Sequence, residues 1–276
     1  MPDASPAPAT DLTIPAVPAG GLLSAQTLLL VLCGVFTGFF VCGDIIGNKG
    51  FSFTFFGLDA GHIGLADPGS PFVATVGLFA FPLTFILTDI VNEYFGRRIV
   101  VRLTAVAVVS LLCLLPVITA AVQAPTVSFA PGVSSEDFGT YFQFAVGPAP
   151  AIIIGSTVAF ITGQLLDISL FSWLRRRTGG RMLWLRAQAS TVGSQLIDSF
   201  VVIFLAFVIL PNLFGIGTAK MSPTVALNVS ITNYVIKFII SIGIVPVLYL
   251  VHFLIRLLLG RVQADALVAQ AHPQAQ

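Results

Sequence analysis

Long runs of apolar residues separated by short polar stretches dominate the sequence. A helix crosses a hydrocarbon core of about 30 Å with about 20 residues, and six stretches reach that length: 24–46, 72–91, 99–122, 149–173, 187–210 and 225–258. We therefore predict an all-α fold, a polytopic membrane protein built as a six-transmembrane-helix bundle. A shorter segment, residues 137–146, precedes the fourth span and is predicted to lie at the membrane interface.

The two ends of the chain lack such runs. Residues 1–23 are rich in Pro and Ala and have no basic segment of the kind that opens a signal peptide, so we predict a disordered tail there. A second disordered tail is predicted for residues 261–276. One membrane domain, residues 24–260, remains between them.

The arginines predict the orientation of the spans. All ten lie within residues 97–102, 175–186 and 256–261, three places that a chain of six spans puts on one side. Loops on the cytoplasmic side of a membrane carry an excess of Lys and Arg. Both termini are therefore predicted to be cytoplasmic.

Composition supports a membrane protein and excludes several other classes. The mean hydropathy is +0.98, and only 9% of the 276 residues are charged, against about 25% in soluble domains. A net charge of +1 gives no basic surface for nucleic acid. The three cysteines and three histidines show no metal-ligand spacing, and no Walker A sequence is present. No metal, cofactor or ATP site is predicted.

The first span contains glycines in pairs four residues apart. Gly34 and Gly38 form one pair, and Gly43 and Gly47 form the other. Small residues at this spacing let two helices approach closely. The partner helix belongs either to the same chain or to a second copy in a homodimer.

Three prolines lie inside predicted spans, namely Pro82, Pro116 and Pro246. They are predicted to kink these helices.

Ionisable residues inside the spans are the main candidates for function, because a charge at the bilayer centre costs about 2.5 to 3.5 kcal/mol. Asp89 and Glu93 share one face of the second span. They are candidates for a substrate path, a proton site or a gate near the cytoplasmic end. A pair between Glu93 and Arg97 that anchors the helix end is the structural alternative.

Spans four and five each carry a Gln three residues before an Asp. Gln164 precedes Asp167, and Gln195 precedes Asp198. The two glutamines lie roughly 12 to 14 Å from the inner ends of their helices, so the two pairs are predicted to meet at one depth. Hydrogen bonds that only hold the two helices together are the alternative.

Span six carries Asn233 and Lys237 on one face. Lys237 is predicted to lie near mid-membrane, where it requires a counter-charge. Asp198 is the best partner by depth and Asp167 the second. A purely structural salt bridge is the alternative reading.

These polar residues come from four helices and are predicted to converge on one cavity. Carboxylates and carboxamides suit a small heterocycle with adjacent N–H and C=O groups, and the 24 phenylalanines offer faces for stacking. The scarcity of cations argues against phosphorylated substrates.

The segment "FPLTFILTDIVNEYFGRR" (81–98), the Gln-Asp motif of span five and "NYVIK" (233–237) resemble the queuosine precursor transporter family, also called the vitamin uptake transporter family. The resemblance runs from about Leu28 to Leu258. It implies a multi-pass protein of the bacterial inner membrane that imports deazapurines, namely 7-cyano-7-deazaguanine or its aminomethyl analogue. Carried over by position are Asp89, Glu93, Gln195, Asp198, Asn233 and Lys237, with the polar pair Asn48 and Lys49. Asp44 stands where many members have Asn.

The resulting hypothesis is transport by alternating access, with no enzymatic activity. Two rival readings stay open at this point. The chain could be the substrate-binding subunit of an energy-coupling vitamin importer, or an intramembrane aspartyl hydrolase that uses Asp167 and Asp198. An ion channel would show rings of like groups, which the sequence does not suggest.

Overall fold

The computed structural model describes residues 23–177 and 183–271. In chain order its elements are α1 (Ala25–Ile46), β1 (Gly50–Phe53), β2 (Phe72–Thr75), η1 (Val76–Phe79), α2 (Phe81–Phe95), α3 (Arg97–Gln123), α4 (Ser135–Val146), α5 (Ala149–Arg177), α6 (Leu183–Phe204), η2 (Leu205–Phe214), α7 (Pro223–Gly243), α8 (Val245–Leu259) and α9 (Arg261–Ala271). The element η1 is a 3-10 helix, and η2 is a π-helix that continues α6. The predicted N-terminal tail lies outside the described residues up to residue 22.

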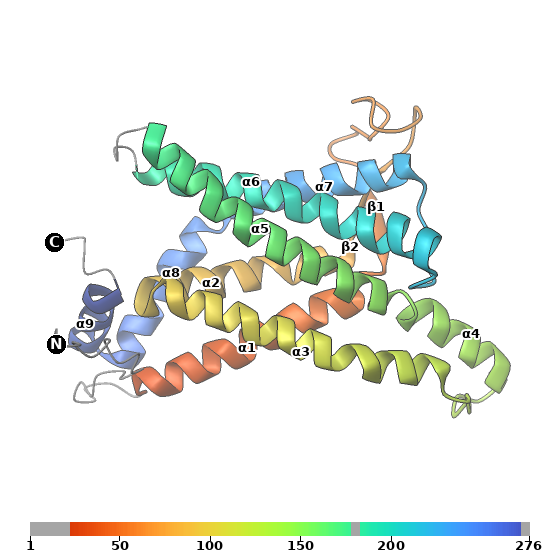
Figure 1. Ribbon diagram of the computed structural model, residues 1–276, viewed down its shortest axis with the longest axis horizontal. Helices are drawn as coiled ribbons and strands as arrows, with labels where there is room; N and C mark the ends of the chain where they lie inside the picture. Colours follow the sequence, from red (N-terminus) through yellow and green to blue (C-terminus); the bar gives the residue numbers. More distant parts are fainter. Residues whose placement is uncertain (1–22, 178–182, 272–276) are drawn as a thin grey trace, which may run out of the picture.

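Most of the helices run side by side along the long axis of the molecule (Figure 1). Within the described ranges, five helical stretches are long and apolar enough to cross a membrane: 25–46, 97–123, 135–163, 192–214 and 223–243. The helices at 246–259 and 261–271, bent by 116°, make a sixth if the pair counts as one span. The all-α, polytopic class is thus confirmed, with five to six spans.

The predicted second span is not one continuous helix. Residues 72–75 form a strand, 76–79 a 3-10 turn, and α2 begins only at Phe81 with Pro82 in its first turn. Proline suits that position because its missing N–H has no partner there anyway. With 15 residues, α2 is about 22 Å long, too short to cross the hydrocarbon core. It begins part-way along the bundle (Figure 1).

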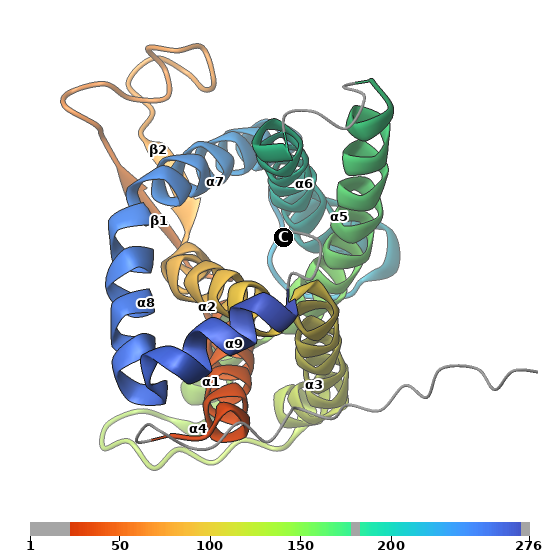
Figure 2. The same cartoon turned by 90° about the vertical axis from the view of Figure 1, so that its left-hand side faces the viewer.

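A short β-hairpin precedes α2. Strands β1 and β2 pair antiparallel, with Gly50 opposite Thr75 and Phe53 opposite Phe72. The hairpin stands beside α7 at one side of the bundle (Figure 2). A purely helical pattern could not predict it, because the apolar residues of β2 fall inside the predicted second span.

The predicted sixth span is also interrupted. Helix α7 ends at Gly243, and α8 starts at Val245 with Pro246 in its first turn. Pro82 and Pro246 therefore start new helices instead of kinking long ones, whereas Pro116 does lie inside α3. A proline cannot donate the hydrogen bond that continues a helix through it.

The prediction of a disordered tail over residues 261–276 is wrong for most of that segment. Residues 261–271 form α9, which lies across one end of the bundle (Figure 2). Ala264 and Leu267 are buried in a core with Tyr94 of α2 and Leu259 of α8. Tertiary packing holds this short helix in place, which composition alone does not reveal.

The interfacial segment predicted at residues 137–146 forms the helix α4. Ser134 caps it by accepting a hydrogen bond from the Asp137 N–H at 3.0 Å. Glu136 and Asp137 lie in its first turn, where the positive end of the helix dipole favours acidic groups.

Candidate functional site

A polar cavity of about 190 Å³ lies where α1, α5, α6 and α7 meet the start of α2. This is many times the roughly 10 to 15 Å³ that one water requires. Its described polar lining comprises Asp44, Thr75, Thr84, Ser156, Asp198, Ser199, Asn233 and Lys237. Its aromatic lining comprises Phe39, Phe40, Phe81, Phe160 and Phe207. Flat apolar walls and a few convergent polar groups are typical of small-molecule sites.

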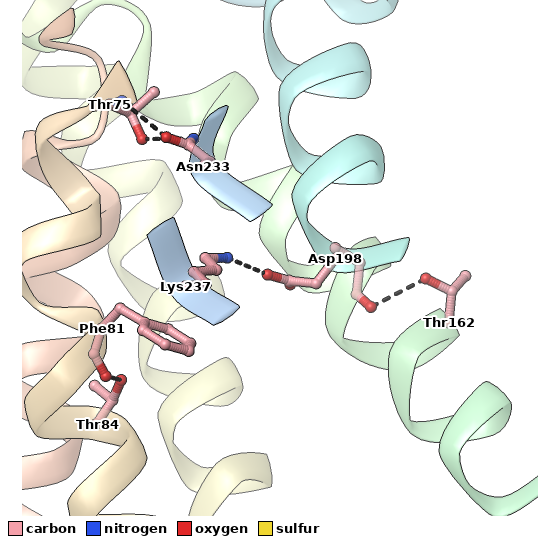
Figure 3. Close-up of polar contacts among 8 residues, drawn as sticks. Thr75, Phe81, Thr84, Thr162, Asp198, Asn233 and Lys237 are labelled. Carbon is pink, nitrogen blue, oxygen red and sulfur yellow. Dashed lines mark hydrogen bonds and ion pairs between the residues drawn. The ribbon is translucent and has the colours of Figure 1, made fainter. Parts of the chain in front are cut away.

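An ion pair crosses this cavity from α7 to α6. The Lys237 Nζ donates to Asp198 Oδ2 at 2.7 Å (Figure 3), which confirms the predicted partner. The same ammonium lies 5.2 Å from the centroid of the Phe81 ring, within the range of a cation–π contact. The Lys237 side chain is 14% exposed and that of Asp198 38%. The Asp198 carboxylate is thus partly exposed, and the residue lines the cavity.

One helical turn from Lys237, Asn233 joins α7 to the broken segment before α2. Its Oδ1 accepts from the Thr75 backbone N–H at 3.2 Å, and its Nδ2 donates to Thr75 Oγ1 at 3.1 Å (Figure 3). The break between β2 and α2 leaves backbone groups without helical partners, and these groups require partners inside a membrane. The buried Asn233 supplies the partner of one of them, the Thr75 N–H. The amide thus fixes the edge of the cavity and faces it as well.

A second carboxylate, Asp44 of α1, lines the cavity and was missed as a site residue by the sequence analysis. The Ser156 hydroxyl of α5 donates to Asp44 Oδ2. Asp44 lies among apolar and small residues of the first span, and its partner is 112 residues away. The one available signal was a carboxylate at membrane depth, the criterion that selected Asp89.

Glycines allow α1 to cross the broken segment at this point. A Cβ added to Gly77 would lie 2.7 Å from the carbonyl oxygen of Gly43 and 3.2 Å from the Cα of Gly47. Gly43 and Gly47 thus serve close packing within the chain. A Cβ at Gly34 or Gly38 would meet nothing within 4 Å, so these two glycines make no such close contact.

The other predicted site residues lie elsewhere or cannot be placed. Asp89 and Glu93 on α2 and the buried Gln195 on α6 are not among the residues that line the cavity. Asp89 and Glu93 are half-buried further along α2 towards Phe95. The side chains of Gln164 and Asp167 lie outside the described residues. Of the six candidates whose side chains are described, the cavity brings together Asp198, Asn233 and Lys237.

A second cavity, of about 610 Å³, lies between the β-hairpin, the start of α2 and α7. Thr232 is the one polar residue in its described lining. Such a surface cannot orient a polar heterocycle, because orientation requires convergent hydrogen-bonding groups. The smaller polar cavity is therefore the candidate site.

Comparisons with known proteins identify the family of the chain. Residues 75–251 match the family described as "Putative vitamin uptake transporter". The chain belongs to this family. It is 33% identical over 177 residues to a "Probable queuosine precursor transporter" of Bacillus subtilis (strain 168), covering 64% of this chain and 70% of that one. It is 28% identical over 200 residues to a "Queuosine precursor transporter" of Escherichia coli (strain K12), covering 72% and 82%. No solved structure matches the chain.

As a member of the vitamin uptake transporter family, the chain is a transporter and not an enzyme. Its apolar helices and its relatives make it a multi-pass protein of the bacterial cell membrane. The matched region includes Thr75, Ser156, Asp198 and Lys237 but begins after α1. Helix α1, which carries Asp44, therefore lies outside the matched region.

Proposed function

We propose that this protein imports a queuosine precursor, a deazapurine such as 7-cyano-7-deazaguanine or its aminomethyl analogue, through the polar cavity. The observation that carries the proposal is the juxtaposition of Lys237, Asp198 and Asn233 in one cavity with aromatic walls. Relatives named for queuosine precursor transport support the class of cargo.

The cavity chemistry fits a neutral, flat base. The lining offers carboxylate and hydroxyl acceptors together with amide and ammonium donors, and a purine-like edge presents the complementary groups. Among the described lining residues, Lys237 is the one cation, and Asp198 already neutralises it. A phosphate group would find no cluster of positive charge. A base without phosphate is therefore the better cargo.

Breaks in the helices provide the means for alternating access. Helix α2 starts part-way along the bundle, α7 and α8 are separated at Ile244, and α6 continues as a π-helix over residues 205–214. Discontinuous helices form the substrate sites of many secondary transporters. The cavity lies between the first of these breaks and α6 and α7. Movement about these breaks opens the cavity first to one side of the membrane and then to the other.

The arrangement of the ends supports an orientation with both termini in the cytoplasm. The start of α1, the α2–α3 junction, the end of α5, the start of α6 and α9 all lie at one end of the bundle, which carries the arginine segments 97–102 and 256–261 (Figure 1). Helix α4 with Glu136 and Asp137 lies at the other end (Figure 1). By the positive-inside rule the arginine-bearing end faces the cytoplasm. A fluorescent protein that folds only in the cytoplasm, fused to the C-terminus, will report this directly.

Reconstitution of the purified chain in liposomes tests the function. Labelled 7-cyano-7-deazaguanine should enter liposomes that contain the chain alone faster than it enters empty liposomes. The rate of entry should saturate as its concentration rises. Binding without entry, together with entry once an ATPase module is added, would instead show a substrate-binding subunit of an energy-coupling importer. Absence of both binding and entry would refute the proposed cargo.

A further inference from the structure

Asp44 is a second carboxylate in the cavity, and it is not part of the Lys237–Asp198 ion pair. Within the described part of the chain, the Ser156 hydroxyl is its one hydrogen-bond donor. A carboxylate has about four lone-pair sites on two oxygens. Most of its accepting capacity therefore has no donor among the described residues, and Asp44 lines the cavity.

Donors placed in the cavity would stabilise the carboxylate form of Asp44. A carboxylate in an apolar region is costly unless donors compensate it. The ammonium of Lys237 donates to Asp198 instead. The cavity leaves room beside Asp44 for a bound molecule that donates hydrogen bonds to the carboxylate.

The aromatic neighbours favour a flat donor group. Phe40 lies four residues before Asp44 on α1, and Phe160 lies four residues after Ser156 on α5, so each shares a helix face with its polar neighbour. Both rings line the cavity. A planar molecule between such faces would direct one edge at the carboxylate.

Two adjacent N–H donors in one plane match the two oxygens of a carboxylate, and such bidentate bonds are among the strongest in proteins. In a guanine-type ring, the ring N–H and the neighbouring exocyclic amino group form this edge. A hypoxanthine-type ring lacks the amino group and offers one donor.

We infer that Asp44 recognises the ring N–H and exocyclic amino group of a guanine-type substrate, and that Ser156 is a positioning residue that holds the carboxylate in place. The inference rests on the proposed function and names the part of the site that selects the substrate. It assigns a specificity-determining role to α1, outside the region that the family match covers.

Binding of two probes to the purified full chain tests this. The probes are 7-cyano-7-deazaguanine and the same compound without its amino group, titrated calorimetrically. The wild type should prefer the amino compound by about 10- to 150-fold, the range for a hydrogen bond to a charged group. Asp44→Asn should lose most of that preference by weakening the amino compound alone, and Ser156→Ala should reduce it less. Asp67→Asn, a matched change in an exposed loop residue, should keep it.

Three results would overturn the inference while the proposed function stands: equal wild-type affinity for both probes, an Asp44→Asn variant that keeps the wild-type preference, or one that weakens both probes equally. The last result would indicate an ion-coupling or structural role. If Asp44→Asn does not fold, the wild-type preference and the Ser156→Ala variant decide. A wild type that binds neither probe would refute the proposed function itself, and the inference with it.

Discussion

Separating the structural from the transport role of the Lys237–Asp198 pair requires a double-mutant cycle. The perturbations are Asp198→Asn, Lys237→Met and both together. Each single change leaves one charge in the cavity without its partner at 2.7 Å. Removing one partner of a fully buried pair costs about 3 to 5 kcal/mol, whereas exposed pairs contribute about 0.2 to 1 kcal/mol.

The exposures of 14% for Lys237 and 38% for Asp198 place this pair between these limits. We expect Asp198→Asn to lower the free energy of unfolding by about 1 to 3 kcal/mol. The double variant should recover at least part of that loss, because no unpaired charge remains. The assay is denaturant unfolding of the purified chain in detergent, with uptake measured in parallel.

Uptake separates the two roles of the pair. If Asp198 and Lys237 contact the substrate, the double variant will be folded yet deficient in uptake. A double variant with both stability and uptake near wild type would show that the pair is only a structural salt bridge. Strictly additive losses of stability would refute the ion pair itself.

Three further outcomes follow from the packing. Gly77→Ala should reduce folded protein in the membrane, because its Cβ would lie 2.7 Å from a backbone oxygen, while Gly34→Ala, with nothing within 4 Å, should match wild type; equal yields would contradict the close crossing. Asn233→Leu should lower the free energy of unfolding by about 1 to 3 kcal/mol, because the buried Thr75 loses its partners, and unchanged denaturant unfolding would show that these bonds contribute nothing. Leu267→Asp should release α9 from its core and expose it to limited proteolysis; resistance equal to wild type would show that α9 is not held there.

Hydropathy predicted most of the bundle because long apolar helices leave an unmistakable pattern. It failed at the second and sixth spans, where a hairpin, a 3-10 turn and proline-started helices are as apolar as a continuous span. Helix α9 was missed because it has few apolar residues, and their role shows only once they are seen packed in the core.

The candidate site was predictable where charge and depth were enough. Lys237 required a counter-charge, and Asp198 lay at its depth, so the pair could be inferred. Asp89 met the same criterion yet lies away from the cavity, because depth does not determine which way a helix turns its faces. Asp44 and Ser156 could not be paired from sequence, since their contact depends on how α1 and α5 cross.

The queuosine content of tRNA shows whether the chain carries this base into the cell through its polar cavity. Bacteria unable to make or import queuosine precursors would express this chain and receive nanomolar 7-cyano-7-deazaguanine. We expect the wild-type chain and Gly34→Ala to restore queuosine, whereas the Asp198→Asn/Lys237→Met variant, present in the membrane at equal amount, should not. No queuosine with the wild-type chain in the membrane, or full restoration by the double variant, would contradict transport of this base through the cavity.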